Sequence, residues 1–194
     1  MTSLTAWMIN LTLSLCVIIL AAGANSSTLH MAASGAVSLV FALLAVREHA
    51  ALTAANATKS IIGASTARYS GLLWAWGALG MLVTYDFILD KHWPEWIQYF
   101  LGFMLAAAGC LFFANVLTKD SESGKDDASV NSLGRMLVIV QFVGMMVAAI
   151  SMLIDGKFPR GTEHPDWAAC NIFFFGALSI AAISLNALLT TRRT

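Results

Sequence analysis

Charge is what this sequence has least of. Asp, Glu, Lys and Arg make up only 11% of its 194 residues, whereas a soluble domain carries roughly 25%. The chain is 58% hydrophobic, and its mean hydropathy is +0.74. We therefore expect the lipid bilayer to be its main solvent. The formal net charge is zero, so the chain has no overall positive charge that would attract nucleic acid. No nucleic-acid partner is expected.

Cysteines and catalytic motifs are equally scarce. Cys16, Cys110 and Cys170 lie in apolar runs without a CxxC partner, so we predict buried small hydrophobic residues rather than a disulfide framework or zinc site. The sequence has no P-loop, GxGxxG or HExxH motif and no arrangement typical of a nucleophilic triad. Charged residues are missing near the middle of the apolar runs, which argues against a proton-coupled pump or voltage sensor. We expect neither an enzyme nor a bound cofactor.

Long apolar runs dominate what remains. A membrane-spanning helix needs about 20 mostly apolar residues, and six runs come close to that length. We predict an all-α integral membrane protein, a single bundle of six transmembrane helices arranged as three sequential hairpins. The expected helices are 6–24, 31–46, 71–89, 97–117, 136–154 and 168–189.

Two polar connections separate these runs. The segment 50–69 is rich in Ala, Thr and Ser, which suits either an extension of the second helix or a helix on the membrane surface. The segment 119–129 (KDSESGKDDAS) has no apolar periodicity, so it is interpreted as a solvated linker.

Lys and Arg predict the orientation in the membrane. Eight of these residues follow the second, fourth and sixth runs, and only Lys91, Lys157 and Arg160 lie on the opposite side. Because cytoplasmic loops carry the excess of Lys and Arg, both termini are predicted to be cytoplasmic. The protein is predicted to be a multi-pass protein of a bacterial inner membrane.

A short motif occurs twice. HWPEW (92–96) and EHPDW (163–167) each precede an apolar run. A shift of 71 residues aligns the Pro, the acid and the Trp of the two motifs, and it also aligns Asn115 with Asn186. The sequence therefore predicts that the third hairpin is a duplicate of the second.

Each residue type of the motif suits the start of a helix at the membrane surface. Proline is tolerated in the first helical turn, an acid favours the positive helix end, and tryptophan prefers the lipid–water interface. Trp93, Trp96 and Trp167 are thus predicted to be interfacial anchors. The alternative is an external metal site with mixed nitrogen and oxygen ligands. Its candidate ligands are Asp90, His92, Glu95, Asp155, His164 and Asp166.

A few polar side chains lie inside the apolar runs. Gln141 and Asn171 are expected either to bond each other or to line a solute path. Asn115 and Asn186, near the ends of their helices, are expected to be helix caps, helix contacts or a pair lining a pore.

The histidines and the aromatic clusters are not expected to form a binding site. His30 and His49 are predicted to be solvated residues at the membrane boundaries. They are 19 positions apart, about 28 Å along a helix, which is too far to clamp one cofactor. The clusters WAW (74–76) and FFF (173–175) are expected to face lipid or the interface rather than to form a binding cage.

Two functions fit these observations. The first is a non-catalytic membrane subunit or scaffold that packs against other membrane chains or copies of itself. Faces of small residues favour it because they let helix backbones approach closely. The alternative is a small-solute or ion channel in which the hairpins surround a path. That path would be lined by Gln141, Asn171, Asn115 and Asn186.

Overall fold

The fold is described by a computed structural model covering residues 3–24, 26–91, 96–122, 128–156 and 166–191. These residues form six α-helices and no strand, so the predicted all-α class is confirmed. One short π-helix, η1, continues α3 without a break. The elements are α1 (Ser3–Gly23), α2 (Ser27–Ala54), α3 (Lys59–Met81), η1 (Leu82–Ile88), α4 (Ile97–Glu122), α5 (Ala128–Ile154) and α6 (Trp167–Thr191).

Most of these helices are long and apolar enough to cross a bilayer. Within the described residues five segments qualify, namely Ser27–Ala54, Lys59–Ile88, Ile97–Lys119, Asn131–Ile154 and Trp167–Thr191. In α1 the apolar stretch Leu11–Ala21 is shorter than that. The chain is therefore a multi-pass membrane protein, and its described residues include five helices of spanning length where the sequence predicted six.

The segment 50–69 is not a surface helix. Residues 50–54 complete α2, and Thr58 caps α3 by accepting a hydrogen bond from the Ile61 amide at 3.4 Å. Most of the residues from Ser60 to Tyr69 are buried. Hydropathy alone misled the sequence interpretation, because small Ser, Thr and Ala side chains are placed here at close helix crossings. Likewise α4 runs on to Glu122 and α5 begins at Ala128, so helix enters the predicted linker from both sides.

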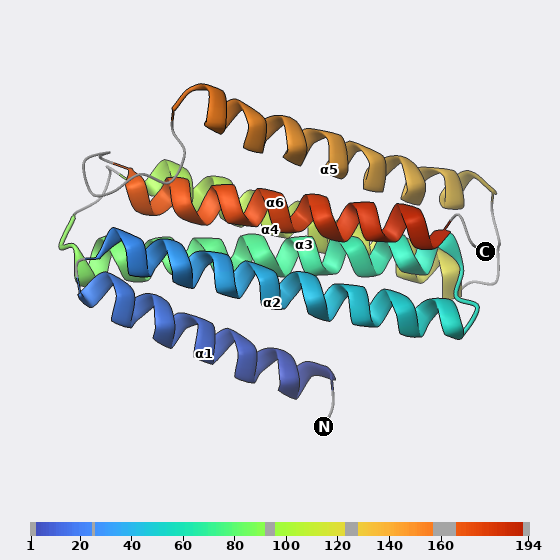
Figure 1. Cartoon of the computed structure of the whole chain (residues 1–194). Coiled ribbons are helices and arrows are strands. Elements are labelled where there is room, and N and C mark those ends of the chain that lie inside the picture. Colours follow the sequence, from blue (N-terminus) through green and yellow to red (C-terminus); the bar gives the residue numbers. More distant parts are fainter. Residues whose placement is uncertain (1–2, 25, 92–95, 123–127, 157–165, 192–194) are drawn as a thin grey trace.

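The helices form a bundle with α2, α3 and α6 at its centre (Figure 1). α4 packs along α3, α5 along α6, and α1 along α2. We call the end where α2, α4 and α6 begin the tip end, and the end where they finish the base end. The largest buried side chains include Phe41, Trp76, Ile172 and Ile180. The central helices therefore share one apolar core, and α1 and α5 lie on opposite sides of it (Figure 1).

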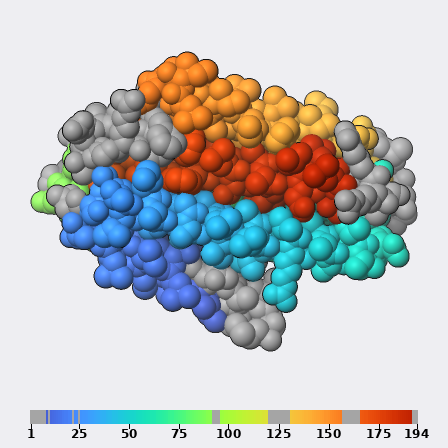
Figure 2. All heavy atoms as spheres, viewed as in Figure 1, coloured from blue at the N-terminus to red at the C-terminus, as the bar shows by residue number. Residues whose placement is uncertain are grey.

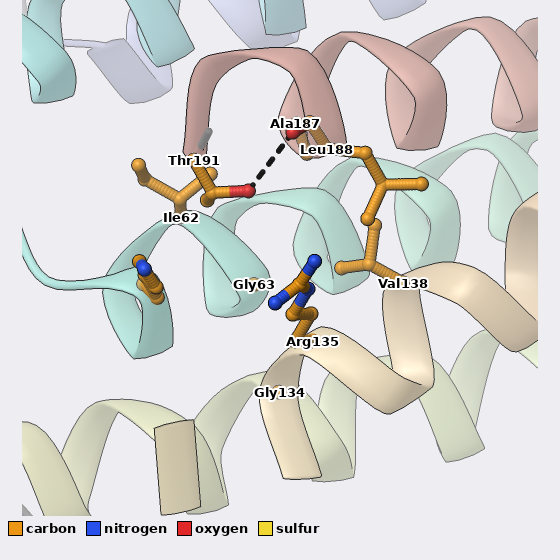
Figure 3. A pocket seen from close by; sticks show the side chains of 9 residues that line it. Ile62, Gly63, Gly134, Arg135, Val138, Ala187, Leu188 and Thr191 are labelled. Carbon is orange, nitrogen blue, oxygen red and sulfur yellow. Dashed lines mark hydrogen bonds between the residues drawn. The ribbon is translucent and has the colours of Figure 1, made fainter. Parts of the chain in front are cut away.

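Glycines bring three helices together at the base end (Figure 3). A Cβ atom on Gly63 of α3 would lie 3.5 Å from the Cα of Gly134 of α5, so the two backbones touch there. α6 contributes Ala187 and Thr191 to this junction. The Thr191 hydroxyl donates a hydrogen bond to the Leu188 carbonyl at 3.1 Å (Figure 3). The space left among them is only about 10 Å³. This crossing is packed rather than open.

Candidate functional site

His30 and His49 are both completely buried, which makes the prediction of solvated boundary histidines wrong. They lie near opposite ends of α2, and each contacts an asparagine of α6. α2 and α6 run parallel and side by side (Figure 1). A histidine inside lipid needs polar partners because its ring nitrogens cannot reach water. The neighbouring helix supplies these partners.

At the base end the polar contacts around His49 form a chain. Asn186 Nδ2 lies 3.0 Å from His49 Nδ1, and Thr66 Oγ1 lies 3.3 Å from His49 Nε2. The Thr66 hydroxyl donates its hydrogen to the Ile62 carbonyl at 2.9 Å, so it accepts from Nε2. An amide nitrogen can only donate. These roles assign a neutral His49 with its proton on Nε2, which satisfies both ring nitrogens.

At the tip end the contacts around His30 are incomplete. Asn171 Nδ2 lies 3.4 Å from His30 Nδ1, and Trp167 meets the imidazole edge to face with ring centroids 4.9 Å apart. His30 Nε2 and Asn171 Oδ1 have no hydrogen-bond partner within the described part of the chain, although both residues are buried. One is a donor and the other an acceptor, and each is left without the polar partner that a buried group needs.

Two buried serines of α2 lie between the histidines. Ser34 and Ser38 are 0% and 1% exposed, and neither hydroxyl has a partner among the described residues. At about 100° per residue, positions 30, 34, 38 and 49 fall within one arc of about 100° on the helix. We call this line, with Asn171 and Asn186 of α6, the polar seam. Its ends are about 28 Å apart, close to the roughly 30 Å thickness of a bilayer core. Between Ser38 and His49 the same arc carries the buried apolar residues Phe41 and Ala45.

A small vestibule lies at the base end of the bundle. Its volume is about 290 Å³, and Glu48, Ser65, Arg68 and Thr118 supply its polar lining. The Glu48 carboxylate accepts hydrogen bonds from Ser65 Oγ at 2.8 Å and from the Tyr69 hydroxyl at 2.7 Å. The predicted second helix ends at residue 46, whereas the longer α2 includes Glu48, which is half-buried. An acid thus stands next to His49 where the seam ends.

The four predicted pore residues do not share one path. Gln141 of α5 donates to Cys110 Sγ at 3.6 Å rather than bonding Asn171, so the expected pairing of Gln141 with Asn171 is wrong. Asn115 is exposed on α4, whereas its counterpart Asn186 contacts His49. Neither asparagine caps a helix, because α4 and α6 continue beyond both. Only Asn171 and Asn186 belong to the polar seam.

The tip motifs do mark helix starts, as predicted. α4 begins at Ile97 and α6 at Trp167. The tryptophans differ from the prediction, because Trp96 is 1% and Trp167 is 6% exposed. Trp96 donates from Nε1 to the Lys91 carbonyl at 2.9 Å. Both rings therefore pack into the bundle instead of anchoring at its surface, and Trp93 lies outside the described residues.

The candidate metal ligands are not gathered by the part of the chain that the structure describes. No group of three His, Cys, Asp or Glu residues suited to a metal ion is found there. Asp90 and Asp155 are exposed, and Asp166 accepts a hydrogen bond from the Tyr99 hydroxyl at 2.9 Å. The other three candidates, His92, Glu95 and His164, lie outside the described residues.

The cysteines and the tryptophans of the WAW cluster differ in burial from the prediction. Cys16 is exposed and Cys110 and Cys170 are half-buried, so the prediction of three buried cysteines is wrong. Trp74 and Trp76 are instead buried. Lipid accepts a thiol on the bundle surface as readily as the core does, whereas large rings fill the space between central helices.

A groove of about 610 Å³ lies between α4, α5 and α6, with Trp74 of α3 at its floor. Three rings in mutual contact line it. Trp74 stacks on Phe103 at 5.3 Å between ring centroids, and Phe173 lies 5.7 Å from Trp74 and 6.4 Å from Phe103. α4 and α5 scarcely touch each other. The groove therefore follows the gap between two helices that pack on different neighbours.

Comparison with models of known protein families, with curated proteins and with solved structures finds no match for this chain.

Proposed function

We propose that this protein is a channel-type membrane protein that passes a small, uncharged, hydrogen-bonding solute along the polar seam. One observation carries the proposal. The seam holds buried polar atoms that find no partner among the described residues, namely His30 Nε2, Ser34 Oγ, Ser38 Oγ and Asn171 Oδ1. Such atoms cost about 1–3 kcal/mol each when unsatisfied. A line of them along the tip-end half of α2 is costly in a purely structural helix contact and useful in a path for a polar solute.

The chemistry of the seam supports an uncharged solute of about the size of water. Its side chains are neutral hydroxyl, amide and imidazole groups, whereas ion paths use rings of charge or carbonyls. The seam is closed as described, because α2 and α6 meet along their length (Figure 2). Phe175 of α6 packs on Gly35 of α2, where an added Cβ would lie 3.3 Å from the ring. Passage therefore requires the two helices to separate near this contact.

Permeability of reconstituted vesicles tests the proposal. Proteoliposomes under an osmotic gradient should shrink faster than protein-free liposomes in stopped-flow light scattering, first for water and then for urea or glycerol. Replacing both seam hydroxyls, Ser34→Ala with Ser38→Ala, should slow the protein-dependent rate several-fold. The same double variant should be slightly more stable, because it removes two unsatisfied polar groups.

Gln141→Leu is the matched control, because Gln141 lies outside the seam and should leave the rate unchanged. Equal permeability of proteoliposomes and protein-free liposomes for every probe would contradict the proposal. If the protein also copurifies reproducibly with the same membrane proteins in mild detergent, the results favour the function as a membrane subunit over the channel.

A non-catalytic membrane subunit is the second candidate function, and α5 favours it. This helix exposes Gly144, where an added Cβ would meet nothing within 4 Å, beside exposed Val143 and Val147. A glycine on an open apolar face lets a helix of another chain approach closely. The same face suits a second copy of this protein, so a homo-oligomer belongs to this candidate.

We further propose that all six helices span a bacterial inner membrane as three hairpins, with the base end and both termini in the cytoplasm. The excess of Lys and Arg at that end supports the orientation. The lengthwise packing of α3 on α4 and of α5 on α6 supports the hairpins. The matching positions of Trp96 and Trp167 at the starts of α4 and α6 support duplication of the second and third hairpins.

A further inference from the structure

We propose that the groove between α4, α5 and α6 binds an amphipathic organic cation that enters from the membrane. The groove is separate from the polar seam, and the proposal goes beyond the path described above. Its volume of about 610 Å³ lies within the range of small-molecule sites. Such sites are mostly apolar and aromatic with a few polar groups at defined places.

The distribution of polar and apolar groups sets the orientation of the ligand. The polar lining residues Gln98, Tyr99 and Asp166 lie in the first turns of α4 and α6 or just before them, at the tip end. Deeper in the groove the lining is aromatic and aliphatic, with rings from α3, α4 and α6 and with Met145 and Met152 from α5. A ligand therefore places its polar part at the tip end and its apolar body along the helices.

The charge of the groove selects a cation. Asp166 is the one formally charged residue among the described residues that line it. Tyr99 donates its hydroxyl hydrogen to Asp166 Oδ2 at 2.9 Å, and both residues line the groove. The described lining of the mouth thus carries one formal negative charge, on the Asp166 carboxylate. An anionic ligand would be repelled there, and a cation would be attracted.

The aromatic wall strengthens this selection. Trp74, Phe103 and Phe173 contact one another and all line the groove. Aromatic faces attract cations, Trp does so most strongly, and the attraction grows in a site removed from water. Aromatic rings combined with one carboxylate are suited to a quaternary or similarly delocalised organic cation. The two methionines add adaptable walls for its apolar body.

Two glycines of α4 provide a matched pair of variants, one inside the groove and one outside it, that add the same uncharged side chain. Gly102 lines the groove and Gly109 does not, yet an added Cβ would meet nothing within 4 Å at either position. Gly102→Leu should therefore place its side chain in the groove from a Cβ position that has room, while Gly109→Leu places the same side chain two turns away. Asp166→Asn removes the carboxylate charge, and Asp90→Asn makes the same change at an exposed residue of the tip end outside the lining.

The test compares tetraphenylphosphonium with tetraphenylborate, two probes of nearly equal size and opposite charge. Binding to the purified full chain in detergent is measured by equilibrium dialysis. The expected result is saturable binding of the phosphonium only, weakened about tenfold or more by Asp166→Asn and by Gly102→Leu. Asp90→Asn and Gly109→Leu should change it less than twofold.

Three outcomes would overturn the proposal. One is equal saturable binding of both probes, which would show attraction to apolar surface without charge selection. Another is binding that Gly102→Leu leaves unchanged, which would place the probe outside the groove or in the detergent. The last is an unchanged affinity in Asp166→Asn. Because Asp166→Asn also alters the contact with Tyr99, thermal unfolding of each variant is recorded, and Gly102→Leu tests the site independently of that contact.

Discussion

At the scale of single residues, the partners of a polar side chain decide its role, and sequence position does not reveal them. Asn115 and Asn186 occupy matching positions of the predicted repeat. Asn115 is exposed on α4, whereas Asn186 donates to His49 at 3.0 Å. The same residue type is therefore a surface group in one helix and part of a buried chain in the other.

The two asparagines make a matched prediction for stability. Asn186→Leu leaves His49 Nδ1 without its donor, so we expect a loss of about 1 kcal/mol in the free energy of unfolding. Asn115→Leu places an apolar side chain on a surface that faces lipid, so stability should stay equal or rise slightly. Thermal unfolding in one detergent measures both variants. Equal losses from the two substitutions would contradict the assignment of Asn186 to the seam.

At the scale of elements, a glycine sets how closely two helices can cross. A Cβ atom on Gly71 of α3 would lie 2.9 Å from Leu111 Cγ and 3.2 Å from the Ala107 carbonyl oxygen of α4. The backbone oxygen cannot move aside as a side chain can. The long contact between α3 and α4 therefore depends on a glycine at this crossing.

Two alanine substitutions should change stability in opposite directions. Gly71→Ala overpacks the crossing of α3 and α4, and we expect it to lower the free energy of unfolding by about 1–3 kcal/mol. Gly109→Ala on α4 has open space around it and gains helix propensity, worth roughly 0.5–1 kcal/mol. The melting temperature should fall in the first variant and stay level or rise in the second. A rise in both would show that α3 and α4 are not in close contact.

At the scale of the whole molecule, the bundle has two ends that differ in chemistry. The base end carries the vestibule with Glu48 and Arg68, and the tip end carries the mouth of the aromatic groove with Asp166. The proposed cytoplasmic location of the base end puts the groove mouth on the outer side. A ligand of the groove would then arrive from the outer half of the membrane.

The orientation is tested at Lys91, which lies at the tip end between η1 and α4. A cysteine at this position should react with a membrane-impermeant maleimide added to intact cells. Cys16, Cys110 and Cys170 are first replaced by serine so that they do not contribute. Lys119→Cys, near the base-end finish of α4, is the control and should react only after lysis. The reverse pattern would invert the proposed topology.

The sequence alone determined the class of the molecule, because charge content and the length of apolar runs are properties of the chain itself. Low charge with long apolar runs requires helices that satisfy their own backbone in lipid. The same local reasoning predicted the starts of α4 and α6, since Pro, acid and Trp act within one helical turn. It also supplied an unused signal, because His30, Ser34 and Ser38 recur at intervals of four residues on one helix face.

Only the tertiary structure decided which polar groups meet. Ser and Thr between 58 and 70 lower the hydropathy of that segment, yet close helix crossings bury them in α3. Asn171 and Asn186 meet the histidines of α2 because α2 and α6 run side by side, a pairing of segments more than 130 residues apart. Trp74, Phe103 and Phe173 likewise come from three helices to form one wall. Contacts between distant segments depend on the packing of the whole bundle, which local residue pattern does not encode.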